Sequence, residues 1–192
     1  MSPSDTAALP SVLVVDDEKE VADAYALRLD PISDVQTAYD GETALRIADE
    51  EPVDVVLLDR HMPSLSGDEV LEELTDREFR GRVIMVTAID PAFDVLGMPF
   101  DDYLCKPVDR EDLQAAVEHQ CTVLAYETLG EYSGAEAKRA VVESEVPAEE
   151  RADHDEFERV EARAERLERR VRRLLDDADS VLDTFDDIGR GS

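Results

Sequence analysis

The sequence predicts an α/β fold, in which a five-stranded parallel sheet is doubly wound with helices on both faces and followed by an α-helical, coiled-coil C-terminal extension. Two observations carry this prediction. Short apolar runs alternate with amphipathic segments five times between residues 11 and 122, and this order requires parallel strands joined by right-handed crossovers. After residue 153, apolar residues recur at spacings of three and four, which is the pattern of a coiled-coil helix.

The strands are expected where short apolar runs end in polar or acidic residues. Such runs are typical of strands that are buried on both faces of a parallel sheet. Val53–Leu58 is the clearest of them, because only Asp54 interrupts it. The five expected strands are Val12–Val15, Asp34–Ala38, Val53–Leu58, Val83–Val86 and Asp102–Cys105.

Helices are expected between these strands, where apolar residues line one face of each segment. The first, Lys19–Leu29, stops before Pro31, because proline interrupts a helix. The segment before the fifth strand leaves room for at most a short helix, at Asp90–Leu96. The other expected helices are Gly41–Asp49, Gly67–Leu74, and one that begins at Arg110 and runs toward Leu129 until Gly130, Ser133 and Gly134 interrupt it.

Polar residues stand at the carboxyl ends of the expected strands, where parallel α/β sheets carry their chemistry. Asp16 and Asp17 follow the first strand, and Asp59 follows the third. Thr87 follows the fourth strand and Lys106 the fifth. Two carboxylates about 4 Å apart repel by roughly 4 kcal/mol at an effective dielectric constant of about 20. Because a hard divalent cation relieves such repulsion, we expect the three carboxylates to bind Mg²⁺.

Lys106 adds a fixed positive charge beside the expected cation. Together, the metal and the lysine would neutralise the oxygens of an incoming phosphoryl group, which is most of what phosphoryl transfer asks of a protein. Asp59 is the expected nucleophile because it ends the central strand. The hydroxyl of Thr87 is expected to donate to the new phosphoryl oxygen.

Four stretches together resemble the receiver domain of two-component response regulators, which has a flavodoxin-like fold. The resemblance covers about Ser11 to Cys121, and although each stretch alone is weak, their combination at successive strand ends is highly specific. The stretches are LVVDDE at Leu13–Glu18, LLDRHMPSLSG at Leu57–Gly67, VTA at Val86–Ala88 and DYLCKP at Asp102–Pro107.

The resemblance implies that a sensor histidine kinase transfers a phosphoryl group from its phosphohistidine to Asp59. It implies Mg²⁺ held by Asp17, Asp59 and the backbone carbonyl of His61. It also implies a cis peptide bond before Pro107, which would direct Lys106 toward the site. The protein is then a self-phosphorylating and slowly self-dephosphorylating switch, not a turnover enzyme. An aspartyl-phosphate phosphatase, the competing enzyme class, would carry a second Asp where His61 stands.

The switch of the family pairs the threonine with an aromatic residue of the fifth strand, and Thr87 and Tyr103 match these positions. On phosphorylation, the hydroxyl moves to the phosphoryl group and the ring turns inward behind it. This is a shift of population between two packings. Arg60, next to the acceptor, is expected to face solvent.

The charge balance is strongly acidic, with 49 Asp and Glu against 20 Lys and Arg and a formal net charge of −29. Such a surface is tolerable mainly where salt screens it, as in a salt-accumulating haloarchaeon; an acidic protein of a mesophile is the alternative. The charge disfavours nonspecific binding of nucleic acid by most of the surface. Two cysteines are too few for a disulfide framework.

The sequence indicates a cytoplasmic protein without a membrane partner. It contains no run of about 18 apolar residues that would span a bilayer. Residues 1–10 carry no Lys or Arg, so they do not resemble a secretory signal, and they are expected to form a disordered tail.

The remaining sequence divides into a receiver domain at residues 11–122, a helical connector at 123–152 and a heptad-repeat helix at 153–189. The apolar stripe of this last helix leaves two arrangements open: a homodimer through the C-terminal helix, or an antiparallel hairpin against Leu124–Val146. The stripe consists of Phe157, Val160, Ala164, Leu167, Val171, Leu174, Ala178, Val181, Phe185 and Ile188.

This C-terminal part resembles the HalX domain, which follows receivers in haloarchaeal response regulators. The resemblance rests on ETLGEYSGAEAKRA at Glu127–Ala140 and on the charged heptad helix. Seven arginines between Arg159 and Arg173 form a basic cluster, which we interpret as a salt-bridged helix face, with nucleic-acid binding less favoured. The favoured function is a switch that controls a helical interaction module, with transcriptional regulation as one output. A direct DNA-binding transcription factor and a degenerate receiver acting as an interaction protein are the alternatives.

Overall fold

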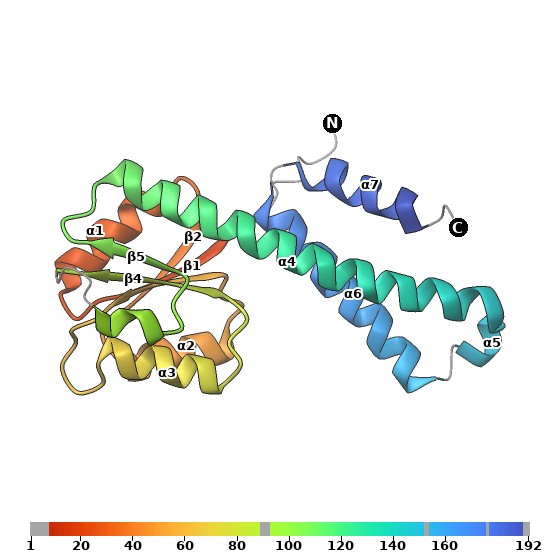
Figure 1. Cartoon of the computed structure of the whole chain (residues 1–192), viewed down its shortest axis with the longest axis horizontal. Coiled ribbons are helices and arrows are strands. Elements are labelled where there is room, and N and C mark those ends of the chain that lie inside the picture. The colour runs from red at the N-terminus through yellow and green to blue at the C-terminus, as the bar shows by residue number, and fades with distance from the viewer. Residues whose placement is uncertain (1–7, 89–92, 152–153, 176, 190–192) are drawn as a thin grey trace. The chain divides into compact units, whose positions relative to one another are not determined.

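The computed structural model describes residues 8–88, 93–151, 154–175 and 177–189, and within these ranges it describes no side chain at positions 94 and 184–189. The chain divides into two compact units, one at Leu9–Cys121 and one from Thr122 onward, both drawn in Figure 1. No helix among the described residues is long and apolar enough to cross a bilayer. Of the disordered tail expected at residues 1–10, residues 1–7 lie outside the described residues.

The first unit is built on a five-stranded parallel sheet with the strand order β2-β1-β3-β4-β5. The strands are β1 (Ser11–Val15), β2 (Asp34–Ala38), β3 (Val55–Asp59), β4 (Arg82–Thr87) and β5 (Asp102–Cys105). The predicted fold class is therefore confirmed. β3 begins after Asp54, which exchanges hydrogen bonds with Ser11: its N–H donates to the Ser11 carbonyl at 2.8 Å, and its carboxylate accepts the Ser11 N–H at 3.0 Å.

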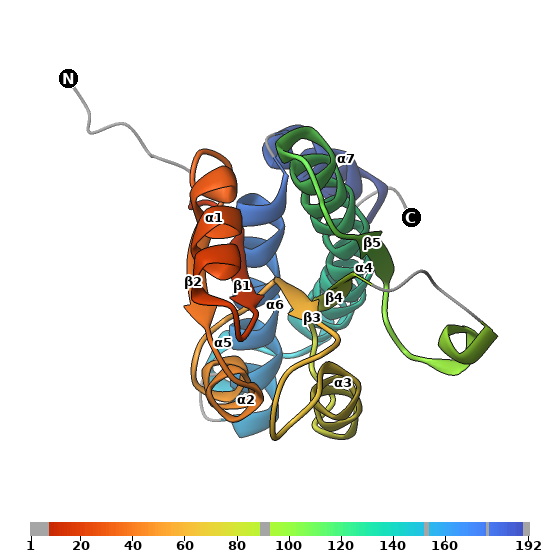
Figure 2. The same cartoon turned by 90° about the vertical axis from the view of Figure 1, so that its left-hand side faces the viewer.

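Helices cover both faces of this sheet. On one face lie α2 (Gly41–Glu50) and α3 (Gly67–Asp76), and on the other lie α1 (Lys19–Leu29) and the first part of α4 (Arg110–Glu145) (Figure 1). Figure 2 shows the same layers from the side of the sheet. Every residue of β3 is buried between them, which explains why its sequence is a continuous apolar run up to the final aspartate.

Between β4 and β5, the described residues contain one 3-10 helix, η1 (Phe93–Gly97). The short helix expected at Asp90–Leu96 overlaps it, and residues 89–92 lie outside the described residues. Phe93 is exposed, whereas Met98 and Phe100 pack against the core. The segment is therefore anchored to the sheet after η1.

Helix α4 continues without a break through 36 residues. The interruption expected at residues 130–134 does not occur, so this prediction was wrong. A glycine destabilises a helix interior by about 1 kcal/mol. Leu129, Tyr132 and Ala135 are buried in a core cluster along this stretch, and their burial outweighs that penalty.

The C-terminal segment folds into several helices. They are α5 (Ala148–Arg151), α6 (Asp155–Leu174) and α7 (Ala178–Gly189). The structure therefore differs from the prediction of one heptad helix over residues 153–189, because α6 and α7 are separate helices. The helix ends at Leu175, whose backbone is extended (φ −126°, ψ 132°). This break lets Ala178 and Leu182 join the buried cluster formed with α4 and α6.

The apolar stripe of α6 and α7 packs against α4 of the same chain. Arg163 of α6 pairs with Glu131 of α4 at 2.8 Å, whereas Val142, later in α4, lines a groove with Phe157, earlier in α6. The two helices therefore run antiparallel, which is the hairpin of the two expected arrangements. The side chains of Phe185 and Ile188, also assigned to the stripe, lie outside the described residues. The core cluster consists of Leu129, Tyr132, Ala135, Ala164, Val171, Ala178 and Leu182.

Val171→Ala is expected to destabilise the helical unit, because the Val171 side chain is fully buried in this cluster. The two lost carbons and the cavity they leave should lower the free energy of unfolding by about 2 kcal/mol. Val141→Ala is the matched control: Val141 is 65% exposed, and its truncation should change stability by less than about 0.5 kcal/mol. Urea unfolding followed by circular dichroism measures both, and equal losses would contradict the hairpin.

Candidate functional site

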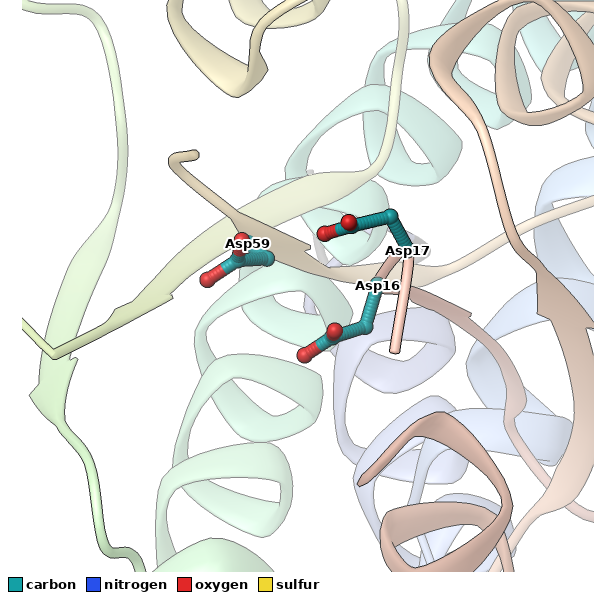
Figure 3. A group of neighbouring side chains, drawn as sticks. All are labelled: Asp16, Asp17 and Asp59. Atoms are coloured by element: carbon teal, nitrogen blue, oxygen red, sulfur yellow. The ribbon is translucent and has the colours of Figure 1, made fainter. Parts of the chain in front are cut away.

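Three carboxylates meet at the carboxyl edge of the sheet. The register pairs Val15 of β1 with Leu58 of β3, so the next residues, Asp16 and Asp59, lie side by side. One oxygen from each of Asp16, Asp17 and Asp59 lies within 4.8 Å of the others. Figure 3 shows these three side chains at the ends of their strands. Carboxylate oxygens are the hard ligands that Mg²⁺ prefers. The three carboxylates predicted as metal ligands are thus brought together, and their oxygens fit a Mg²⁺ ion.

Lys106 supplies a positive charge to this cluster. Its ammonium nitrogen lies 2.7 Å from Asp16 Oδ2 and 2.9 Å from Asp59 Oδ1. The lysine follows β5, where its backbone N–H donates to the Thr87 carbonyl at 2.7 Å, and its peptide bond to Pro107 is cis. The Lys106 ammonium group therefore bonds two of the three carboxylates.

Backbone N–H groups hold the other oxygen of the same two carboxylates. The N–H of His61 donates to Asp59 Oδ2 at 3.1 Å, and the N–H of Glu18 donates to Asp16 Oδ1 at 2.9 Å. Asp16 and Asp59 each have one oxygen on Lys106 and the other on a backbone donor. Both carboxylates are therefore fixed in orientation by the fold.

Burial and the ion pair act in opposite directions on the pKa values of Asp59 and Lys106. Asp59 is 6% exposed, and burial raises the pKa of its carboxyl group, while the hydrogen bond and charge of Lys106 oppose the rise. Burial alone would lower the pKa of the Lys106 ammonium group. The hydrogen bonds and charges of Asp16 and Asp59 outweigh that effect, and the pKa of Lys106 is raised. Lys106 therefore stays charged at neutral pH.

The loop after Asp59 is closed against the start of α3. The Gly67 N–H donates to the Arg60 carbonyl at 2.9 Å, and a Cβ atom at Gly67 would overlap the carbonyl oxygen of Asp59. Ser66 caps α3, since its hydroxyl accepts the Glu69 N–H at 3.3 Å and its own N–H donates to the Glu69 carboxylate at 2.8 Å. Glycine is required at position 67 by contact with the backbone of Asp59.

The expectation that Arg60 faces solvent was wrong. Its side chain is 14% exposed. Its guanidinium group forms a two-point ion pair with Asp68, with Nε 3.0 Å from Oδ1 and Nη2 3.1 Å from Oδ2. The two residues are eight positions apart, and no strand or helix period relates them. The sequence pattern therefore carries no signal for this pair.

The two expected switch residues lie on neighbouring strands. Thr87 ends β4 and is buried, and β4 is also the strand that pairs with Asp59 of β3. Tyr103 lies on β5 opposite Met85. Its ring packs beside Phe100, with ring centroids 5.5 Å apart, against the core cluster that includes α2 and α3.

This chain resembles proteins of known sequence. A Haloferax volcanii protein named "Putative transcriptional regulator" is 44% identical over 145 residues, which cover 74% of this chain and 25% of that protein. The alkaline phosphatase synthesis transcriptional regulatory protein PhoP of Bacillus subtilis is 39% identical over 111 residues, which cover 56% of this chain and 46% of that protein. The chain thus spans a quarter to about half of the length of these relatives.

Solved structures and family models also match this chain. The crystal structure of a CheY-like response regulator receiver domain protein from Methanospirillum hungatei has a TM-score of 0.59 at 25% identity, covering 62% of this chain and 99% of that one. The family model of the response regulator receiver domain matches residues 12–118, and that of the HalX domain matches residues 122–189. The chain therefore belongs to the response regulators, as a receiver domain followed by a HalX domain.

Proposed function

We propose that this protein is the phosphorylation switch of a two-component system, in which a histidine kinase transfers a phosphoryl group to Asp59. The observation that supports this most is the pairing of buried Asp59 with Lys106 at 2.9 Å, beside two further carboxylates. Membership of the receiver family supports a histidine kinase or another phosphodonor as the partner. The switch turns over one phosphoryl group slowly and does not act as an enzyme on other substrates.

The three carboxylates and the backbone carbonyl of His61 would hold Mg²⁺, which when bound neutralises charge on the phosphoryl oxygens. A carboxylate oxygen of Asp59 attacks the phosphorus of the kinase phosphohistidine. The P–N bond breaks, and the imidazole nitrogen keeps its electron pair. Lys106, already bonded to Asp59, stabilises the oxygens of the transferred group because its charge is fixed before the reaction begins.

The signal would leave the site through Thr87 and Tyr103. The Thr87 hydroxyl, one strand away from Asp59, donates to a phosphoryl oxygen. The Tyr103 ring, which packs beside Phe100 in this structure, then turns inward behind it. Contacts made only with the phosphoryl group favour the second packing, so phosphorylation shifts the population of the two states.

We propose regulation of transcription as the output, in the cytoplasm, with residues 11–122 as the receiver and 123–189 as the output module. The names of both relatives support this class. Direct binding of DNA by the arginines of α6 is the second candidate, since α6 carries seven of them. Ion pairs with glutamates engage arginines of this cluster, which favours a protein partner; among them are Arg163–Glu131, Arg169–Glu165 and Arg172–Glu168.

Incubation with phosphoramidate and Mg²⁺ in concentrated KCl should add one phosphoryl group to the wild type and none to Asp59→Asn. Asparagine keeps the shape of the side chain but has no anionic oxygen to attack phosphorus. Intact-protein mass spectrometry measures the adduct. Asp76→Asn, an exposed carboxylate at the end of α3, is the matched control and should be labelled like the wild type. Labelling of Asp59→Asn at the wild-type level would refute the proposal.

Lys106→Ala should slow this labelling on the order of ten- to a hundred-fold, because a fixed charge at the reacting oxygens is lost. It should also uncouple the signal from the adduct. Hydrogen exchange of the β5 amides, with beryllofluoride as the phosphoryl mimic, should change in the wild type and stay unchanged in the variant. A full response of β5 in Lys106→Ala would rule out the coupling role of this lysine.

Without Mg²⁺, Asp59→Asn is expected to raise the free energy of unfolding at neutral pH. Because burial raises the pKa of Asp59, its ionised form is less favourable in the folded protein than in the unfolded chain. The gain should shrink as the pH falls through the raised pKa, since the wild-type carboxylate then takes up a proton. Urea unfolding with a chelator, at neutral and mildly acidic pH, measures this difference. A variant that is less stable than the wild type at neutral pH would contradict it.

A further inference from the structure

We infer that Arg60 and Asp68 are positioning residues of the Mg²⁺ site: their ion pair closes the loop 61–66 and holds the His61 carbonyl where it can face the ion. This inference rests on the proposed function, because the ion site belongs to that proposal. Neither side chain is among the candidate ligands. Both would act through the backbone carbonyl of His61, two residues after Asp59.

Backbone and side-chain hydrogen bonds join the two ends of this loop. The Arg60 carbonyl accepts the Gly67 N–H at 2.9 Å, and the Arg60 guanidinium group donates twice to Asp68, at 3.0 and 3.1 Å. Because Gly67 also touches the Asp59 carbonyl oxygen, the acceptor strand, the loop ends and the start of α3 form one fixed unit. The loop 61–66 leaves this unit and returns to it.

Inside the loop, the His61 N–H donates to Asp59 Oδ2 at 3.1 Å, and Leu65 packs against the core cluster. Met62 is buried in the core cluster, which anchors the loop on one side of His61. Ser64 has a φ of 71°, a left-handed conformation that a non-glycine residue keeps only where its surroundings hold it. His61 itself is exposed. The His61 carbonyl is therefore placed by the bond from the His61 N–H to Asp59, by the anchor at Met62 and by the closure at Arg60.

The Arg60–Asp68 pair is suited to this role by its geometry and burial. A planar guanidinium group that meets a carboxylate at two points fixes orientation as well as distance. The side chains of Arg60 and Asp68 are 14% and 44% exposed, so solvent screens this pair less than the Arg46–Glu50 pair on α2, whose side chains are 59% and 60% exposed. Asp68 also stands in the first turn of α3, where the helix dipole favours a carboxylate.

Loss of the clamp should weaken Mg²⁺ binding and leave the fold intact. Groups that orient metal ligands commonly change metal affinity by about 10- to 100-fold when they are removed. We expect Arg60→Ala to raise the dissociation constant of Mg²⁺ about ten-fold. Asp68→Ala should do the same, and the double variant should be no worse than either single one, because both changes break the same pair. Arg60→Lys, which keeps the charge but not the two-point geometry, should fall between.

The experiment is a calorimetric titration of the full chain with Mg²⁺ in concentrated KCl, together with hydrogen exchange of residues 61–66. Arg77→Ala is the matched control. Arg77 lies at the other end of α3 and pairs with Glu73 and Asp49, so its loss should change stability without changing Mg²⁺ affinity. Asp68→Asn replaces Asp68→Ala if the latter fails to fold.

Faster exchange in the loop and weaker Mg²⁺ binding in both single variants, with no further loss in the double variant, would support the clamp. Wild-type Mg²⁺ affinity in folded Arg60→Ala, additive losses in the double variant, or an equal loss in Arg77→Ala would overturn it. A wild type that binds no Mg²⁺ would instead refute the proposed function. Unchanged loop exchange in Arg60→Ala would still count against the clamp in that case.

Discussion

The mutual repulsion of three carboxylates at one sheet edge is the constraint on which the rest of this site depends. Asp16, Asp17 and Asp59 are forced together because adjacent parallel strands end at the same level. With Lys106 bonded to two of them, three negative charges and one positive charge leave a formal charge of −2. One divalent cation would balance this remaining charge of −2. The fold thus holds an electrostatic imbalance that a divalent metal ion can resolve.

The surroundings of the site prevent the chain from relaxing this imbalance. Both oxygens of Asp16 and of Asp59 are tied, one to Lys106 and one to a backbone N–H. Rotating either side chain out of the cluster would break its ion pair with the partly buried Lys106 and its bond to a backbone N–H, which is unfavourable. The core on both faces of the sheet makes the strand ends rigid in turn. The packing of the whole receiver unit therefore holds the carboxylates together against their mutual repulsion.

Much of the fold and most of the candidate site followed from the sequence, for identifiable physical reasons. Strands buried on both faces must be apolar throughout, so Val53–Leu58 was recognisable, and the residue after such a run lies at the carboxyl edge by necessity. That rule identified Asp59 as a candidate site residue, and it identified the doublet Asp16–Asp17 in the same way. Such features depend on local pattern and on topology, both of which are written in the linear sequence.

The features that escaped prediction all depend on tertiary contacts. The glycines of α4 suggested a break, but burial of Leu129 and Tyr132 against other helices decides the outcome. The end of α6 at Leu175 is set by how α7 packs, which no heptad count reveals. The Arg60–Asp68 pair joins residues that share no periodic relation. In each case, the deciding energy comes from a partner distant in sequence.

The contact between Gly67 and the Asp59 carbonyl oxygen has an implication for inherited variation. Every missense change of a glycine codon adds at least a Cβ atom, so no amino-acid replacement at this position avoids the overlap. Selection at Gly67 should therefore act on volume alone and be indifferent to charge or polarity. A strain that loses signalling through such a change would keep every reacting group intact, and a screen that reads only the reactive residues would overlook it.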